Sequence, residues 1–287
     1  MKLTMCAVVA LTLGVSAQER ETSYTTLDFP GAAATTMTGI NTEGAMVGFY
    51  RDAAGKTHGF VRRRDTYASI DFPDAAWTNA RGIRATGDVV GAYRMAGEPE
   101  VNQHGYRLGR DGQFSKIDFP GHVSTVPVRL LPGGTIVGCY HDAAGMDSMH
   151  GMSLVRNAFS GFDRAMTMHQ GATPDGRTIV GYFAEMVDMR RNHAYVLEGA
   201  SFVPFDVPDS VSTTAIDINA SGAIVGVYEA PAGKTHGFVR EGSQYVTLDV
   251  PGARSSSAWG INSGGTIVGA FVDAGGVTHG LVVTRKR

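Results

Sequence analysis

Residues 27–60 read LDFPGAAATTMTGINTEGAMVGFYRDAAGKTHGF, and versions of this stretch recur along the rest of the chain. Each version begins with an aspartate between apolar residues, and in most versions a proline follows. These aspartates lie 43 to 47 residues apart, at Asp28, Asp71, Asp118, Asp163, Asp206 and Asp249. A period of this length, repeated six times, predicts an array of equal structural units.

Three further segments follow each aspartate, namely Gly-Ile-Asn, Ile-Val-Gly-x-Tyr and His-Gly-Phe or close variants. All are short, rich in β-branched or aromatic residues, and bounded by glycine, aspartate or proline, which predicts strands. With the aspartate segment, each unit has four strands. We therefore predict an all-β, six-bladed β-propeller with four antiparallel strands per blade. A pair of β-trefoils would require a threefold grouping that these near-equal units lack.

The phase of the repeat makes a prediction about closure. The chain enters the pattern at a fourth-strand segment, residues 24–29, and leaves it after a third-strand segment, residues 279–283. The two ends should therefore share one blade, with the N-terminal strand closing the last sheet. Such closure removes the exposed edge that an open array would have.

The motif set also resembles a known family. The Asp-Phe-Pro-Gly, Gly-Ile-Asn, Ile-Val-Gly and His-Gly-Phe/His-Ala-Tyr steps are similar to those of the extracellular HAF-repeat proteins of bacteria, over residues 24–287. The resemblance implies export and a propeller-like fold. It implies no particular reaction, so function has to be argued from sites.

The first residues predict export by themselves. Met1-Lys2 precedes an apolar run from Leu3 to Val15, and Ala17 supplies a small residue before a cleavage point. The run is too short to span a bilayer. We expect a signal peptide over residues 1–17, a single mature domain over 18–287, and a secreted or periplasmic location. A net charge of −2 without a basic run argues against nucleic acid as a partner.

Histidines divide into two classes. Six belong to the repeat, and we interpret them, with the six aspartates, as structural, because a residue needed once for chemistry has no reason to recur in every blade. Three lie outside the motif, namely His122, His141 and His169. We expect them in loops on one face of blades 3 and 4. Three imidazoles can hold a divalent metal (Zn, Mn or Ca) and leave a position open for substrate, the alternative being three ordinary surface histidines.

Other residues of blades 2 to 4 complete the predicted site. Acidic side chains there could act as the general base, and arginines could receive an anionic substrate. The candidate bases are Glu185 and Asp188, and the candidate substrate-binding residues are Arg84, Arg94, Arg190, Arg191 and Trp77, whose indole could stack on a sugar.

Three functions remain open from the sequence. The first is a metal-dependent lyase or hydrolase acting on an anionic saccharide or a lactone-like or ester-like substrate. The second is a non-catalytic propeller that binds glycans or acts as a scaffold. The third is copper binding, because methionine is concentrated near the extra histidines, at Met146, Met149, Met152, Met166, Met168, Met186 and Met189. The lone mature cysteine, Cys139, is predicted to be a buried, inert thiol.

Overall fold

A computed structural model describes residues 21–142, 149–162, 164, 166–185 and 188–286, except for the side chains of residues 185 and 188–190. These residues form strands β1 to β24 without a helix. The predicted signal peptide falls on residues 1–17, which lie outside the described part. No helix in the described part is long and apolar enough to cross a membrane.

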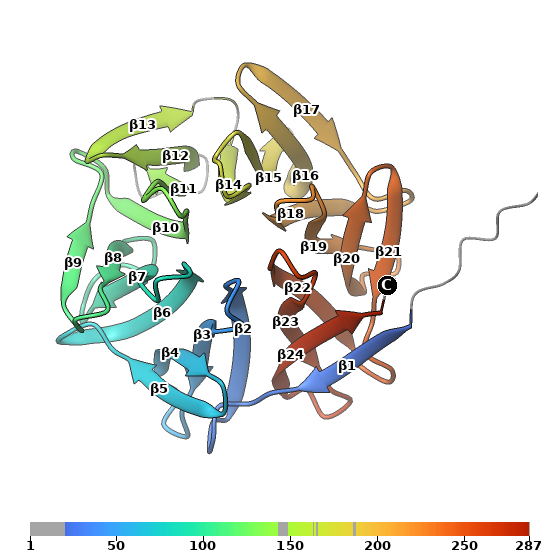
Figure 1. Ribbon diagram of the computed structural model, residues 1–287, viewed down its shortest axis with the longest axis horizontal. Helices are drawn as coiled ribbons and strands as arrows, with labels where there is room; N and C mark the ends of the chain where they lie inside the picture. The colour runs from blue at the N-terminus through green and yellow to red at the C-terminus, as the bar shows by residue number, and fades with distance from the viewer. Residues whose placement is uncertain (1–20, 143–148, 163, 165, 186–187, 287) are drawn as a thin grey trace, which may run out of the picture.

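The strands fall into four classes by their distance from the axis (Figure 1). The innermost strands are β2 (Ala34–Ile40), β6 (Ala75–Ile83), β10 (Ser124–Leu130), β14 (Met166–Ala172), β18 (Ser212–Ile218) and β22 (Ser255–Ile261). The second strands are β3 (Met46–Arg51), β7 (Val89–Met95), β11 (Ile136–His141), β15 (Thr178–Glu185), β19 (Ile224–Glu229) and β23 (Ile267–Val272). The third strands are β4 (Thr57–Arg63), β8 (His104–Leu108), β12 (Met149–Val155), β16 (Asp188–Glu198), β20 (Thr235–Glu241) and β24 (Thr278–Arg285). The outermost are β5 (Thr66–Ile70), β9 (Phe114–Ile117), β13 (Ala158–Phe162), β17 (Ser201–Phe205), β21 (Gln244–Leu248) and β1 (Thr22–Thr26).

Each sheet has four antiparallel strands, and six sheets form a ring, which confirms the predicted propeller. Blades 1 to 5 are the sheets that begin with β2, β6, β10, β14 and β18. Blade 6 has the order β1-β24-β23-β22. Its outer strand comes from the N-terminus, with Thr22 opposite Arg285 and Thr26 opposite Leu281, so the predicted closure is also confirmed.

The Ile-Val-Gly motif is explained by close packing within a blade. In blade 1, a Cβ atom on Gly48 would collide with the carbonyl oxygen of Thr36 on the inner strand and with the ring of Phe60 on the third strand. Glycine therefore lets the aromatic residue of His-Gly-Phe lie flat over the second strand. The core sits between neighbouring blades, as in the cluster where Val47 and Val61 of blade 1 pack with Ala80 and Tyr106 of blade 2.

The ring has two distinct faces. One face carries the loops between second and third strands and the connections between blades, and we call it the "loop face". The opposite face carries the turns between first and second strands (residues 41–45 in blade 1) and between third and fourth strands (residues 64–65 in blade 1), and we call it the "turn face". The sequence places the candidate site on the loop face.

Candidate functional site

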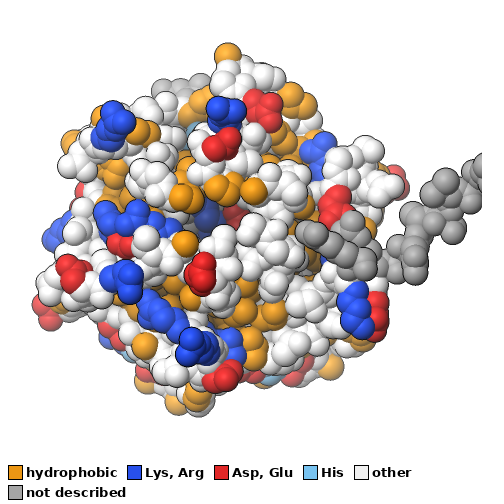
Figure 2. All heavy atoms as spheres, in the orientation of Figure 1, with side chains coloured by type: hydrophobic (Ala, Val, Ile, Leu, Met, Phe, Trp, Pro, Cys, Tyr) orange, Lys and Arg blue, Asp and Glu red, His pale blue; other side chains and the backbone are white. Residues whose placement is uncertain are grey.

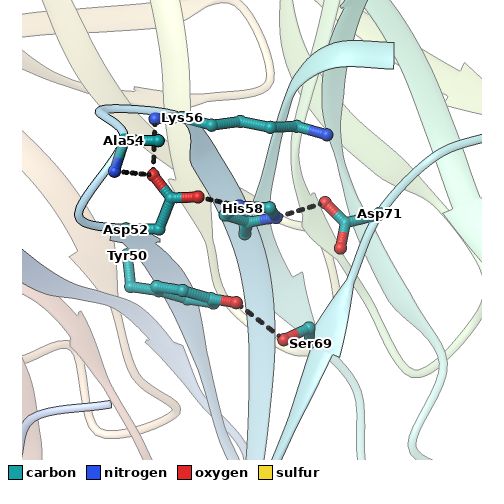
Figure 3. A network of polar contacts seen from close by, with 7 residues as sticks. All are labelled: Tyr50, Asp52, Ala54, Lys56, His58, Ser69 and Asp71. Carbon is teal, nitrogen blue, oxygen red and sulfur yellow. Dashed lines mark hydrogen bonds and ion pairs between the residues drawn. The ribbon is translucent and has the colours of Figure 1, made fainter. Parts of the chain in front are cut away.

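The repeat histidines form polar networks on the loop face (Figure 3). In blade 1, His58 Nδ1 lies 2.7 Å from Asp71 Oδ1, and Nε2 lies 3.3 Å from Asp52 Oδ2. Asp52 also accepts hydrogen bonds from the backbone N–H groups of Ala54 and Lys56. His58 thus ties the aspartate of the outer connection to the third strand, and the 2–3 loop to both.

Equivalent contacts recur in other blades. The pairs are His104 with Asp118, His193 with Asp206, His236 with Asp249, and His279 with Asp28, at 2.7 to 3.2 Å. In the last pair, the hydrogen bond that the His279 ring donates to the Asp28 carboxylate raises the pKa of His279, against the effect of burial. The structural interpretation of these repeat residues is supported, because the same bond connects strands in blade after blade.

The first extra histidine joins one of these networks. His122 Nδ1 lies 2.7 Å from Asp142 Oδ1, and the other oxygen of Asp142 lies 2.8 Å from Nε2 of the repeat histidine His150. The His122 ring packs edge-on against Phe119 and beside Tyr140. His122 is therefore on the loop face as predicted, where it extends the network of blade 3.

The other two histidines lie within strands, which corrects the prediction for His169. His141 is the last residue of β11 and is 9% exposed, whereas His169 lies inside β14 and is 2% exposed. The His169 ring packs over Gly151 of blade 3, and its Nδ1 lies 2.5 Å from Tyr195 Oη. In the part of the chain that the structure describes, no three or more His, Cys, Asp or Glu residues form a group that could hold a metal. The structure therefore does not assemble the predicted triad, and a bound metal stays a prediction.

Acid stability tests the burial of His169. Desolvation lowers the pKa of His169 to about 4, whereas a histidine in an unfolded chain titrates near 6.5. Between these values the unfolded state binds a proton that the native state does not, so the free energy of unfolding falls as the pH drops from about 6.5 to about 4, by roughly 3 kcal/mol in total. We expect His169→Phe to lose most of this dependence in urea unfolding at pH of about 7.5 and about 4.5. His122→Gln is the control, and an unchanged pH slope in His169→Phe would contradict the burial.

The predicted substrate-binding residues do not share one face. Trp77 pairs with Arg94 at the loop-face end of β6 and β7, whereas Arg84 follows the opposite end of β6. There Arg84 Nε lies 2.8 Å from Asp88 Oδ2, and Arg107 Nη2 lies 2.7 Å from Oδ1. Burial would raise the pKa of Asp88, but the bonds from Arg84 and its neighbours hold it well below its usual value. Arg84 thus belongs to an ion-pair network on the turn face.

The remaining candidates divide by what the structure describes. Trp77 packs half-buried in an apolar cluster with Met168 and Tyr182, so its indole is part of the core between blades. Arg191 is exposed in β16. The backbones of Glu185 and Asp188 pair at the end of the β15–β16 hairpin, but their side chains, and that of Arg190, lie outside the described atoms.

The methionine-rich region is mostly core. Met149, Met152 and Met166 are buried in apolar clusters of blades 3 and 4, while Met146 and Met186 lie outside the described residues. Cys139 is fully buried, and burial raises the pKa of its thiol to about 12, which agrees with the predicted inert role. Copper binding stays a prediction without support from these positions.

The axis of the ring carries a buried ion pair that the sequence analysis missed. Arg129 of blade 3 and Asp217 of blade 5 lie 3.2 Å apart, Nε to Oδ1. Arg129 also donates to the carbonyl oxygen of Trp259 in blade 6, and the backbone N–H of Ile261 donates to Asp217 Oδ2 at 3.0 Å. Both residues stand out when the repeats are aligned, because the equivalent inner-strand position in the other four blades is glycine, at Gly39, Gly82, Gly171 and Gly260.

Cavities open between neighbouring blades on the turn face. They measure about 520 Å³ between blades 1 and 2, 860 Å³ between blades 2 and 3, 1260 Å³ between blades 4 and 5, and 60 Å³ between blades 5 and 6. These grooves are lined by turns of the turn face, and the one between blades 2 and 3 also extends to Asp118 at the loop-face end of β9.

The largest of these grooves coincides with a change in the repeat. The asparagine of Gly-Ile-Asn caps the 1–2 turn and donates to the next blade, as Asn219 Nδ2 does to the carbonyl oxygen of Asn262. Blade 4 has Thr173 instead, whose hydroxyl donates to Asp175 in its own turn. The groove between blades 4 and 5 is larger than the one next to Asn219 and Asn262. The tie alone does not set the volume, because Asn41 donates to the carbonyl oxygen of Arg84 beside the groove of about 520 Å³ between blades 1 and 2. Comparing the turns across repeats could have revealed the change at Thr173.

Comparisons with known proteins identify the fold and no family. No protein-family model matches the chain, and no curated protein matches it. Solved propellers do match. One is the β-propeller domain of the Trilobed protease from Pyrococcus furiosus, with an open velcro topology, at 11% identity and TM-score 0.53 over 89% of this chain and 96% of that one. In this chain, by contrast, β1 closes the seam.

Two other matches are proteins of different kinds. A mutant of Aleuria aurantia lectin in complex with α-methyl-L-fucoside is 13% identical, with a TM-score of 0.54 over 92% of this chain and 96% of that one. A putative gluconolactonase is 12% identical, with a TM-score of 0.56 over 92% of each chain. At these identities the likeness shows a shared fold.

Proposed function

We propose that this protein is a saccharide-binding propeller whose main site is the groove between blades 4 and 5 on the turn face. The observation that carries the proposal is the groove itself, about 1260 Å³ in volume, which is large enough for an oligosaccharide. It lies where the asparagine tie between neighbouring blades is replaced by Thr173.

The lining of this groove suits a sugar. Saccharides offer hydroxyl groups and apolar C–H faces, so their sites combine polar side chains with an apolar floor. Here the floor includes Ile179, Val196 and Ile218, and the rim includes Ser221 and Glu198. The Glu198 carboxylate is held by the Thr178 hydroxyl at 3.0 Å, which fixes an acceptor for a ligand hydroxyl.

The fold neighbours are compatible with this function, since a lectin bound to α-methyl-L-fucoside has the same architecture. The metal-dependent lyase or hydrolase predicted from the sequence would need a metal centre, and the three extra histidines are not brought together around one. A putative gluconolactonase shares the fold. Because the described histidines do not form a metal centre and the groove between blades 4 and 5 is present, the geometry of the described residues favours saccharide binding over a metal-dependent lyase or hydrolase reaction.

A steric block tests the proposal. Ala220 lies exposed on the lip of the groove, in the 1–2 turn of blade 5, and Ser263 is its equivalent in blade 6 beside the 60 Å³ cavity. We expect a panel of fucosylated, galactosylated and glucan oligosaccharides to contain a ligand whose affinity falls about tenfold or more in Ala220→Trp, measured by calorimetry. Ser263→Trp should leave the affinity unchanged. Equal binding by both variants, or no binding to any member of the panel, would rule the groove out.

A further inference from the structure

The groove between blades 1 and 2 differs from the others in its charge. Its polar lining consists of Arg63, Arg64 and Arg110, with Asn41, Thr86 and a single acidic residue, Glu43, in a cavity of about 520 Å³. Figure 2 shows Lys and Arg side chains in a row over the boundary between these two blades. An excess of positive charge in a concave surface attracts and concentrates anions.

The surrounding arginines already have carboxylate partners, which sets the three groove arginines apart. Arg84 and Arg107 share Asp88, and Arg62 lies 2.9 Å from Asp65. Among the described contacts, Arg63 bonds to a backbone oxygen, that of Gly87, at 3.4 Å, and no carboxylate pairs with the three groove arginines. Their guanidinium groups therefore keep most of their donors for a ligand.

The backbone of blade 2 leaves room between these side chains. Gly87 has a φ of +93°, and a Cβ atom built there would lie 3.5 Å from Arg63 Nη2 and 3.7 Å from Arg110 Cγ. The two arginines thus approach the glycine from blade 1 and from blade 2. A ligand held between them would contact both blades at once.

Arg64 occupies a backbone position that favours glycine. It begins the two-residue turn between β4 and β5 with a φ of +54°, whereas the equivalent residues of blades 4 and 5 are Gly199 and Gly242. A left-handed conformation is unfavourable for a residue with a Cβ atom. Arginine at this turn therefore reduces folding stability, and what it adds is a cation at the edge of the groove. Arg156 of blade 3 has the same geometry, with a φ of +49°.

We propose that the groove between blades 1 and 2 binds a sulfate ester or carboxylate group of an acidic polysaccharide, through Arg63, Arg64 and Arg110. Arginine forms paired, charge-assisted hydrogen bonds with both kinds of oxyanion. The proposal concerns a different groove from the one between blades 4 and 5 and holds whether or not that groove binds saccharide. It also means that an anionic polymer would meet this protein on its turn face.

Matched glucans separate the charge from the sugar. Binding to dextran, dextran sulfate and carboxymethyl dextran is measured by biolayer interferometry in low and physiological salt. We expect binding to one or both charged polymers, decreasing with salt, and none to neutral dextran. The stronger of the two charged polymers identifies the preferred group. Equal binding to neutral dextran, or no binding to either charged polymer, would overturn the proposal.

Variants locate the anion in the groove. Arg64→Gly should weaken binding about fivefold to tenfold while the melting temperature stays the same or rises. Arg156→Gly loses the same charge from the same kind of turn, and it should bind like the wild type. Glu43→Gln should bind about twofold to threefold more tightly, a gain that misfolding cannot produce. Equal losses in Arg64→Gly and Arg156→Gly would show diffuse attraction and contradict a site in this groove, and so would an unchanged affinity in Glu43→Gln and Arg64→Gly.

Discussion

Arg129→Met is expected to lower the free energy of unfolding by about 3–5 kcal/mol, because it leaves the buried carboxylate of Asp217 without its partner. The variant also removes the bonds from Arg129 to the carbonyl oxygens of Arg81 and Trp259, so contacts with blades 2, 5 and 6 are lost together. For a domain of this size the melting temperature should fall by roughly 6–15 °C, measured by calorimetry.

A double-mutant cycle distinguishes the ion pair from simple packing. Arg129→Met combined with Asp217→Asn should lose less stability than the sum of the two single variants, since the second substitution removes the charge that the first one strands. If the losses add, or if Arg129→Met costs under about 1 kcal/mol, the pair does not hold the axis together.

The pH dependence of the same variant follows from Asp217. Burial raises the pKa of Asp217, and Arg129 opposes that rise. Without Arg129, the native pKa of Asp217 lies further above the value of about 3.9 that the residue has in the unfolded chain. Below that pH, Asp217 is protonated in both states and its burial costs no charge desolvation. As the pH rises, the unfolded chain ionises more readily than the native state, so the loss of stability grows. The stability lost in Arg129→Met should therefore be smaller near pH 4 than near pH 7.

Removal of β1 should have the second large effect. A chain that begins at Leu27 lacks the five residues that pair with β24, together with the packing of Tyr24 on blade 6. We expect a loss of about 3 kcal/mol or more in urea unfolding, from hydrogen bonds worth roughly 1 kcal/mol each and from lost apolar burial. The freed edge of β24 should also promote association, visible by light scattering.

A peptide supplied in trans provides the control. A chain that begins at Glu21 should melt like the wild type, and a synthetic peptide of residues 18–26 should restore much of the stability of the shorter chain by adding a strand to the open edge. A scrambled peptide should not. If the chain that begins at Leu27 remains monomeric and as stable as the one that begins at Glu21, the seam contributes little.

The fold could be predicted because the same physical requirement acts in every blade. Glycine at Gly48 and its equivalents is needed for close packing, and a histidine such as His58 is needed to tie strands, so each requirement appears in the sequence repeatedly. The closure of the ring could be predicted because every blade needs four strands, and the chain begins with a fourth-strand segment and leaves the pattern after a third-strand segment.

The candidate site was predicted less well, because position within a repeat does not give the direction of a side chain. His169 departs from the motif, yet its ring packs against Gly151 in the core, where the other blades place residues such as Met37 or Ala80. Arg84 is a candidate from sequence because it stands where blades 1, 5 and 6 have the asparagine of Gly-Ile-Asn. The strand that precedes it ends on the turn face, and there its partner is Asp88.

The ion pair at the axis could not be predicted from one repeat at a time. A single arginine or aspartate in place of glycine resembles random variation in one blade, and its structural role depends on a residue two blades away. Arg129 and Asp217 become informative only when the ring is closed and both project toward one axis. Long-range charge complementarity of this kind is not visible in a local pattern.

The seam between β1 and β24 also determines how the ring would respond to mechanical tension. The two strands are antiparallel, so the chain ends leave from the same end of the pair, where the backbone N–H of Lys286 donates to the carbonyl oxygen of Glu21 at 3.0 Å. A force that separates the two ends would load these bonds one after another, like a zipper, and a small force would suffice. Tension applied across both termini would therefore open blade 6 first, whereas a molecule held by one end would carry no load across its seam.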